Sequence, residues 1–221
     1  MNTDNNARIA GILFITATVA AVISGVLLES TSDPDYLILV SANKTKVLAG
    51  ILLDFTCALA VVAIPVMLYP ILKQYNETLA LGYIGTRIIE SVIIVVGDIS
   101  NLSLLSLSQE YVLAAAPDDS FQILGTLLQA TYDWTFLLGP GIVFSLTALI
   151  LNYILYKSRL IPRWLSGWGL IGATLLLVAD LLAIFGSDQV LLLAAPIGLQ
   201  EMVFAGWLIV KGVESTPNKI K

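Results

Sequence analysis

The chain has 221 residues, of which 57% are hydrophobic and only 12% are charged, and its formal net charge is -5. Soluble domains carry about 25% charged residues. The composition therefore excludes an ordinary soluble domain and, with its long apolar runs, predicts an all-α polytopic protein of the lipid bilayer. The acidic balance argues against nucleic acid as a partner. The chain has no histidine and a single cysteine, Cys57, which excludes His-based triads, His metal sites and an intramolecular disulfide.

The first apolar run follows a short polar N-terminus and predicts a membrane span over residues 8–28. We expect this span to be retained, because a cleavable signal peptide has an apolar region of only about 7–15 residues. Small residues along the span, Gly11 and Gly25 among them, permit close approach of a neighbouring helix. Asp33 followed by Pro34 is typical of a helix start and predicts a short surface helix over residues 35–42.

The second and third spans are predicted over residues 47–72 and 80–107. The second contains Asp54 and two prolines, Pro65 and Pro70, each of which removes a backbone donor and tends to kink a helix. The third would be roughly 42 Å long at about 1.5 Å per residue, which exceeds a hydrocarbon core of about 30 Å. We therefore expect the third span to tilt or to protrude from the bilayer.

The third span carries a polar face within an apolar sequence. At about 100° per residue, its polar side chains fall within an arc of about 100°. Ionisable groups in hydrocarbon cost about 3 kcal/mol each even on a lenient scale, so this face should turn into the bundle, toward a partner or water. The residues of the face are Arg87, Glu90, Ser91, Asp98 and Asn101.

The apolar region from 120 to 157 is too long for one straight span, at about 57 Å. We predict that it divides into a surface helix over residues 120–130, capped by Asp119, and a crossing helix over 133–156. Gly139-Pro140-Gly141 should weaken or break the crossing helix part-way. The last two spans are predicted over residues 163–185 and 190–211, the second with Pro196 and Glu201.

Lysine and arginine are distributed unevenly between the predicted loops. If the N-terminus is cytoplasmic, every basic residue except Lys44 and Lys46 lies on or toward the inner side. This bias predicts a bundle of six membrane-spanning helices with the N- and C-termini cytoplasmic, and it places both short surface helices on the extracytoplasmic side.

Arg87 is a basic residue that the predicted topology places inside the bundle. Glu90 lies three positions along the same helix, so the two can pair. One interpretation is a structural ion pair that fixes the rotation of the third span. The other is a gate, or an anchor for the anionic group of a ligand. The sequence leaves both open.

The other acids in or near the spans have no basic partner in their own helices. One arginine cannot neutralise all of them, so some must be protonated, bind a cation or face water. Asp133 and Asp180 are expected near the outer headgroups, and Asp54 could hydrogen-bond a neighbour. The sequence identifies no catalytic residue, metal or cofactor. The candidate ligand- or ion-binding residues are Arg87, Glu90, Asp98, Glu201 and Asp54, with Asp133 and Asp180 as weaker candidates.

An ordered set of stretches resembles a known family. They are RIAGILF, VMLYPILK, ETLALGYIGTRIIES, LIPRWLSGWGLIGA and LQEMVFAGWLIVKG. Together they resemble the membrane proteins catalogued as domain of unknown function 4386, from about Arg8 to Gly212. The resemblance implies a single six-span domain in the cell membrane of a bacterium or archaeon. It implies no activity and no site residue.

Three functions compete. We favour a protein that binds or transports a small molecule, lipid or cation at an acid-rich site among spans two, three and six, bordered by kinked helices. The next is an accessory protein whose buried charges only lock helix packing. The last is an intramembrane enzyme on a lipid or isoprenoid, which needs carboxylates that converge for acid–base chemistry.

Overall fold

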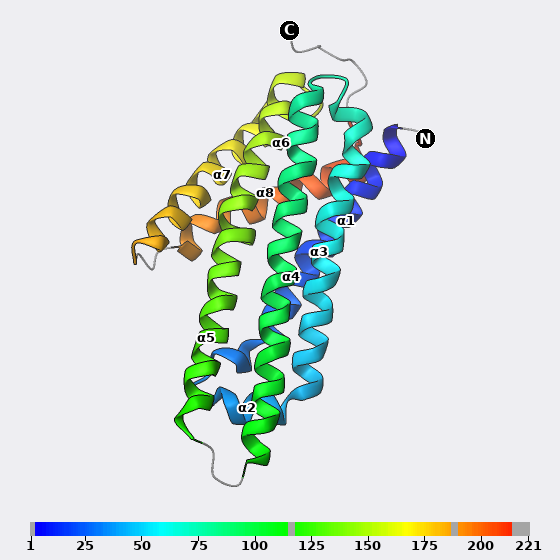
Figure 1. Cartoon of the computed structure of the whole chain (residues 1–221). Helices are drawn as coiled ribbons and strands as arrows, with labels where there is room; N and C mark the ends of the chain where they lie inside the picture. The colour runs from blue at the N-terminus through cyan, green and yellow to red at the C-terminus, as the bar shows by residue number, and fades with distance from the viewer. Residues whose placement is uncertain (1–2, 115–117, 187–189, 214–221) are drawn as a thin grey trace.

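The computed structural model describes residues 3–114, 118–186 and 190–213, and in this part of the chain every regular element is a helix. Six helices are long and apolar enough to cross a membrane, so the predicted six-span, all-α bundle is confirmed. Figure 1 shows these helices side by side in one elongated bundle. Lys219 and Lys221, which contribute to the predicted charge bias, lie outside the described residues.

The elements follow one another closely along the chain. They are α1 (Thr3–Leu27), a 3-10 turn η1 (Glu29–Ser32), α2 (Tyr36–Ala42), α3 (Lys44–Leu72), α4 (Glu77–Leu113), α5 (Asp119–Phe136), a π-helix η2 (Leu137–Val143), α6 (Phe144–Ser158), α7 (Arg163–Ile184) and α8 (Val190–Val210).

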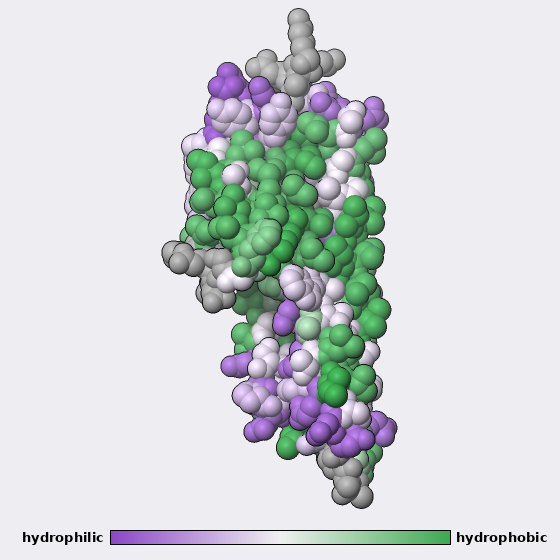
Figure 2. Space-filling model, turned by 60° about the vertical axis from the view of Figure 1, so that its left-hand side comes forward, coloured by the Kyte–Doolittle hydropathy of each residue, from purple (hydrophilic) through white to green (hydrophobic). Residues whose placement is uncertain are grey.

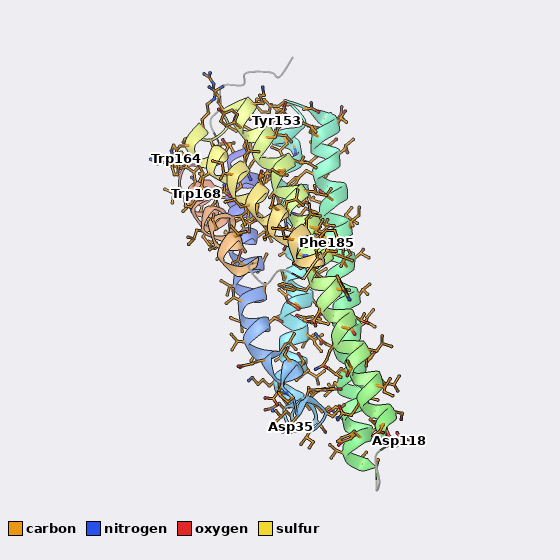
Figure 3. All side chains as sticks on the ribbon, turned by 90° about the vertical axis from the view of Figure 1, so that its left-hand side faces the viewer. Asp35, Asp118, Tyr153, Trp164, Trp168 and Phe185 are labelled. Atoms are coloured by element: carbon orange, nitrogen blue, oxygen red, sulfur yellow. The ribbon has the colours of Figure 1, made fainter. Side chains whose placement is uncertain are left out.

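Both ends of the described chain lie at the same end of the bundle, at the top of Figure 1, as an even number of spans requires. We call this the terminal end, and the end with α2 and the start of α5 the distal end. The placement of the termini in the cytoplasm stays a prediction. Figure 2 shows an apolar belt with hydrophilic residues beyond it at each end. Phe185, at the end of α7, lies only part-way along the molecule in Figure 3, so α3, α4 and α5 extend distally beyond α7 and α8.

Two apolar cores hold the bundle at different levels. The terminal core joins Phe14 of α1, Leu68 of α3 and Phe204 of α8, and the rings of Phe14 and Phe204 meet edge to face at 5.5 Å. The distal core packs Leu37 and Val40 of α2 against Leu104 of α4. The buried cluster between α1 and α3 further along consists mostly of small residues, Ala17, Ala20, Cys57 and Ala60, with Val61. Space therefore remains inside the bundle between the two cores.

Helix α4 is the scaffold of the bundle. The side chain of Asn76 caps it by accepting a hydrogen bond from the Leu79 N–H at 2.9 Å. Its 37 residues span about 55 Å, so the predicted protrusion is present and the helix is longer than the predicted range 80–107. Hydroxyl groups along it donate to backbone carbonyls of three neighbours: Ser91 to Ala58 of α3, Ser100 to Leu128 of α5 and Ser108 to Leu37 of α2.

The predicted division of residues 120–157 is not seen, because helix continues from Asp119 to Ser158. Pro140 does not break it; the chain widens into the π-helix η2, a form that absorbs an irregularity without leaving the helix. Gly139 and Gly141 let this segment lie close to Ile93 and to Asp180. The N-cap is Asp118 and not Asp119: the Ser120 N–H and hydroxyl donate to Asp118, and they lower the pKa of its carboxyl.

Candidate functional site

Arg87 and Glu90 lie on the inner face of α4, each with about 3% of its surface exposed. The Arg87 Nη1 donates to both carboxylate oxygens of Glu90, at 3.0 and 3.2 Å. The pair predicted from their spacing is therefore present. It lies within one helix, so by itself it joins no two parts of the bundle.

Glu201 of α8 completes the cluster. Its Oε1 lies 3.6 Å from the Arg87 Nη2, which is an ion pair without a short hydrogen bond. The Glu201 side chain is 18% exposed, against 4% for Glu90. One guanidinium thus lies between a fully engaged carboxylate and a loosely held one, and the loosely held carboxylate reaches the surface of a cavity.

Aromatic rings surround the guanidinium. Its central carbon lies 5.9 Å from the ring centre of Phe14, 5.8 Å from Tyr83 and 5.3 Å from Phe144, within the range of cation–π contact. The Arg87 Nε and the Tyr83 hydroxyl have no hydrogen-bond partner among the described residues. The rings therefore hold the arginine in place mainly by packing and cation–π attraction.

The cluster forms part of the wall of a central cavity of about 280 Å³, which lies between the two apolar cores. Helices α1, α3, α4, α5 and α8, with η2 and α6, all contribute to it. Most of the wall is apolar, and the ionisable groups on it, apart from Cys57 and Tyr132, are Asp54, Arg87, Glu90 and Glu201. The remaining side chains include Phe14, Val22, Cys57, Ile94, Tyr132, Phe136, Pro140 and Phe144.

The structure separates the other predicted residues. Asp98 is 4% exposed and neither carboxylate oxygen has a hydrogen-bond partner among the described residues, but Asp98 does not line the cavity. Asp133 lines a second, distal pocket of about 190 Å³ with Asn101 and Gln129. A residue at the level of the headgroups would be exposed, but Asp180 is only 2% exposed and packs against Gly141 of η2. Arg87, Glu90 and Glu201 therefore form one cluster, Asp54 lines the same cavity, and Asp98, Asp133 and Asp180 do not line it.

Sequence reasoning missed the aromatic part of the site. Tyr83 could have been found, because it lies one helical turn before Arg87 on the same face. Phe14 and Phe144 gave no such signal, since each lies in an apolar helix with many similar residues and reaches Arg87 only through the packing of the bundle.

The donor set does not favour a tightly held metal ion. Among the described residues, no three side chains of histidine, cysteine, aspartate or glutamate lie close enough to hold one. The arrangement instead pairs a long apolar wall with a few charged groups at one place, which is the usual chemistry of a site for a small organic molecule.

Six apolar helices around a partly charged internal cavity define a multi-pass membrane protein. Residues 9–212 match the family described as Domain of unknown function (DUF4386), and the chain belongs to that family. No curated protein and no solved structure matches the chain.

Proposed function

We propose that this membrane protein binds, and in the cell transports, a small organic cation in its central cavity, within the cell membrane of a prokaryote. The observation that carries the proposal is the charge on the cavity wall. In the part of the chain that the structure describes, Asp54, Glu90 and Glu201 line the cavity with a single guanidinium, that of Arg87. A positively charged ligand would balance this excess of carboxylates.

The geometry favours Glu201 as the group that meets the ligand. Glu90 accepts two hydrogen bonds from Arg87, whereas Glu201 accepts none from the residues that the structure describes and stays partly exposed. A carboxylate without a full partner in a low-dielectric interior is costly, so a cation beside it gains a favourable interaction. Because Arg87 is already shared by two carboxylates, we assign it to hold them in place and not to bind an anionic group.

The aromatic rings support the same class of ligand. Phe14 and Phe144 line the cavity next to the charged cluster, and Tyr132 lines it further along. Aromatic faces attract quaternary and protonated amines. Pro140 of the π-helix also lines the cavity, and interrupted helices commonly border binding sites in transporters.

One observation favours the accessory alternative. Arg87 joins α4 to α8 through Glu201, so the same charges could serve only to lock two helices together. The intramembrane enzyme has less support, because Asp98 does not line the cavity with Glu90 and Glu201.

Calorimetric titration of the purified protein tests the proposal with three probes of similar shape: benzyltrimethylammonium, benzoate and benzyl alcohol. We expect the ammonium ion to bind best and Glu201→Gln to weaken its binding at least tenfold. Asp180→Asn, which neutralises a buried carboxyl outside the cavity, is the matched control and should leave the affinity unchanged. Equal binding of all three probes, or a Glu201→Gln variant that changes only thermal stability, would favour the accessory role.

A further inference from the structure

The central cavity opens at the side of the bundle. We call its rim those lining residues that are exposed at the surface of the bundle, which are Ala21, Val22 and Gly25 of α1 and Phe136 of α5. Val22 is 63% exposed and Phe136 is 60% exposed. No atom lies within 4 Å of the place where a Cβ would stand on Gly25, so this part of the rim faces open space. The rim is therefore apolar and lies on membrane-spanning helices.

The opening follows from the unequal lengths of the helices. In its first half α1 packs against α8, where Gly11 lies against Ala205 and Phe14 against Phe204. In its second half α1 packs against α3, and among the described residues no comparable packing joins α1 to α5. Figure 3 shows α7 ending at Phe185 while α1 and α5 continue distally, and Figure 2 shows the surface recessed beneath this level.

One side chain is shared by the central cavity and the distal pocket. The distal pocket is polar, and Tyr132 lines both this pocket and the central cavity, so its side chain lies where the two adjoin. The Gln129 side chain of α5 donates to the Thr31 carbonyl of η1 and ties α5 to the chain after α1 at the distal pocket. Asn101 lines the pocket with an amide nitrogen that has no acceptor among the described residues, as expected for a site that holds water.

We infer that the cavity exchanges its ligand sideways with the bilayer, through the mouth between α1 and α5. The ligand is then an amphiphile that partitions into lipid, with an apolar alkyl or aryl body, and not a hydrated inorganic ion or a sugar-like solute. The positive charge of this amphiphile rests on the proposed function; the lateral route does not.

The only cysteine of the chain is a reporter for this route, because Cys57 lines the cavity. The full chain is placed in lipid vesicles and treated with two thiol reagents, benzyl methanethiosulfonate, which dissolves in the bilayer, and trimethylammonioethyl methanethiosulfonate, which stays in water. The rate at which each reagent modifies Cys57 is divided by the rate at which the same reagent modifies free glutathione, which corrects for the different intrinsic reactivities of the two reagents. We expect the benzyl reagent to modify Cys57 at least ten times faster. The acidic cavity attracts the cationic reagent, so charge repulsion cannot explain a slow reaction.

Two tryptophan substitutions then locate the path. Gly25→Trp narrows the mouth and should slow the benzyl reagent at least tenfold. Gly85→Trp is the control, because Gly85 of α4 also faces open space but does not line the cavity. Tyr132→Ala removes the side chain that the cavity shares with the distal pocket and should speed the cationic reagent. Circular dichroism and thermal unfolding confirm that each variant is folded.

Two results would overturn the lateral route. One is a cationic reagent that reacts as fast as the benzyl reagent, with no effect of Gly25→Trp. The other is a Cys57 that neither reagent modifies until the protein is denatured. A separate result concerns the proposed function alone: if the benzyl reagent reacts through the mouth but benzyltrimethylammonium gives Cys57 no protection, the route is supported and the cation site is not.

Discussion

At the scale of single residues, Arg87 determines what the cavity can do. A guanidinium stays charged at any physiological pH and carries five N–H donors in a fixed plane. Here Glu90 accepts from one of its nitrogens, Glu201 faces another, and aromatic rings surround the remainder. The arginine therefore sets the positions of two carboxylates. Because it carries one positive charge and they carry two negative charges, the net charge of the cluster is negative.

Removing this arginine should destabilise the protein strongly. Arg87→Met leaves Glu90 buried beside Glu201 without a cation, and breaking a buried pair on one side costs about 3–5 kcal/mol. The double variant Arg87→Met, Glu90→Met also removes one of the two carboxylates that the single variant leaves unpaired, and because Glu201 remains it should recover only part of that loss. The free energy of unfolding, measured in detergent micelles, checks both. A single variant as stable as the wild type would show that Arg87 does not hold the cluster.

Residue-level prediction succeeded where the partners share a helix. Arg87 and Glu90 are three positions apart, and helical geometry alone brings them together. Glu201 is on another helix, and its approach to Arg87 depends on how α8 packs on the bundle, which spacing does not encode. Asp98 shows the opposite error: it shares the polar face of α4 and is buried, but it does not line the cavity.

At the scale of elements, α4 carries the site, and its start is fixed by a side-chain cap. Asn76→Ala removes the acceptor for the Leu79 N–H, and losing such a cap costs about 1 kcal/mol. We expect faster hydrogen exchange of the amides over the first turn of α4, measured by mass spectrometry. Gln74→Ala, two residues earlier in the loop, is the control, because the Gln74 side chain donates to the Pro70 carbonyl and not to α4. Unchanged hydrogen exchange in Asn76→Ala would show that the Asn76 side chain does not stabilise the start of α4.

Hydropathy predicted all six spans. Asp33-Pro34 predicted a short helix, which is present as α2, but the helix begins at Tyr36 after Asp35, so Asp33 is not its N-cap. Hydropathy did not predict that α5, η2 and α6 form one helix, because Gly139-Pro140-Gly141 is ordinarily a sign of interruption. The sequence cannot distinguish a break from a π-helix. That choice depends on tertiary contacts, here the close approach of Gly139 to Ile93 and of Gly141 to Asp180.

At the scale of the whole molecule, the cavity exists because packing is tight at two levels and incomplete between them. The terminal core closes the bundle on one side of the charged cluster, and the distal core closes it on the other, with Tyr132 where the cavity adjoins the distal pocket. The short α7 and α8 leave α1 unpaired with α5, and this gap becomes the mouth. None of this could be read from the separate spans, because it depends on the relative lengths and levels of helices distant in sequence.

The most direct test asks where an organic cation lies when it is bound. Nuclear Overhauser effects can be measured between the N-methyl protons of benzyltrimethylammonium and the phenylalanine rings of the protein in micelles, with each ring assigned by substitution. We predict contacts to Phe14 and Phe144, which surround Arg87, and none to Phe185, which is 87% exposed at the end of α7. Contacts to Phe185 and other lipid-facing rings, without contacts to Phe14 or Phe144, would contradict a cation site inside the bundle.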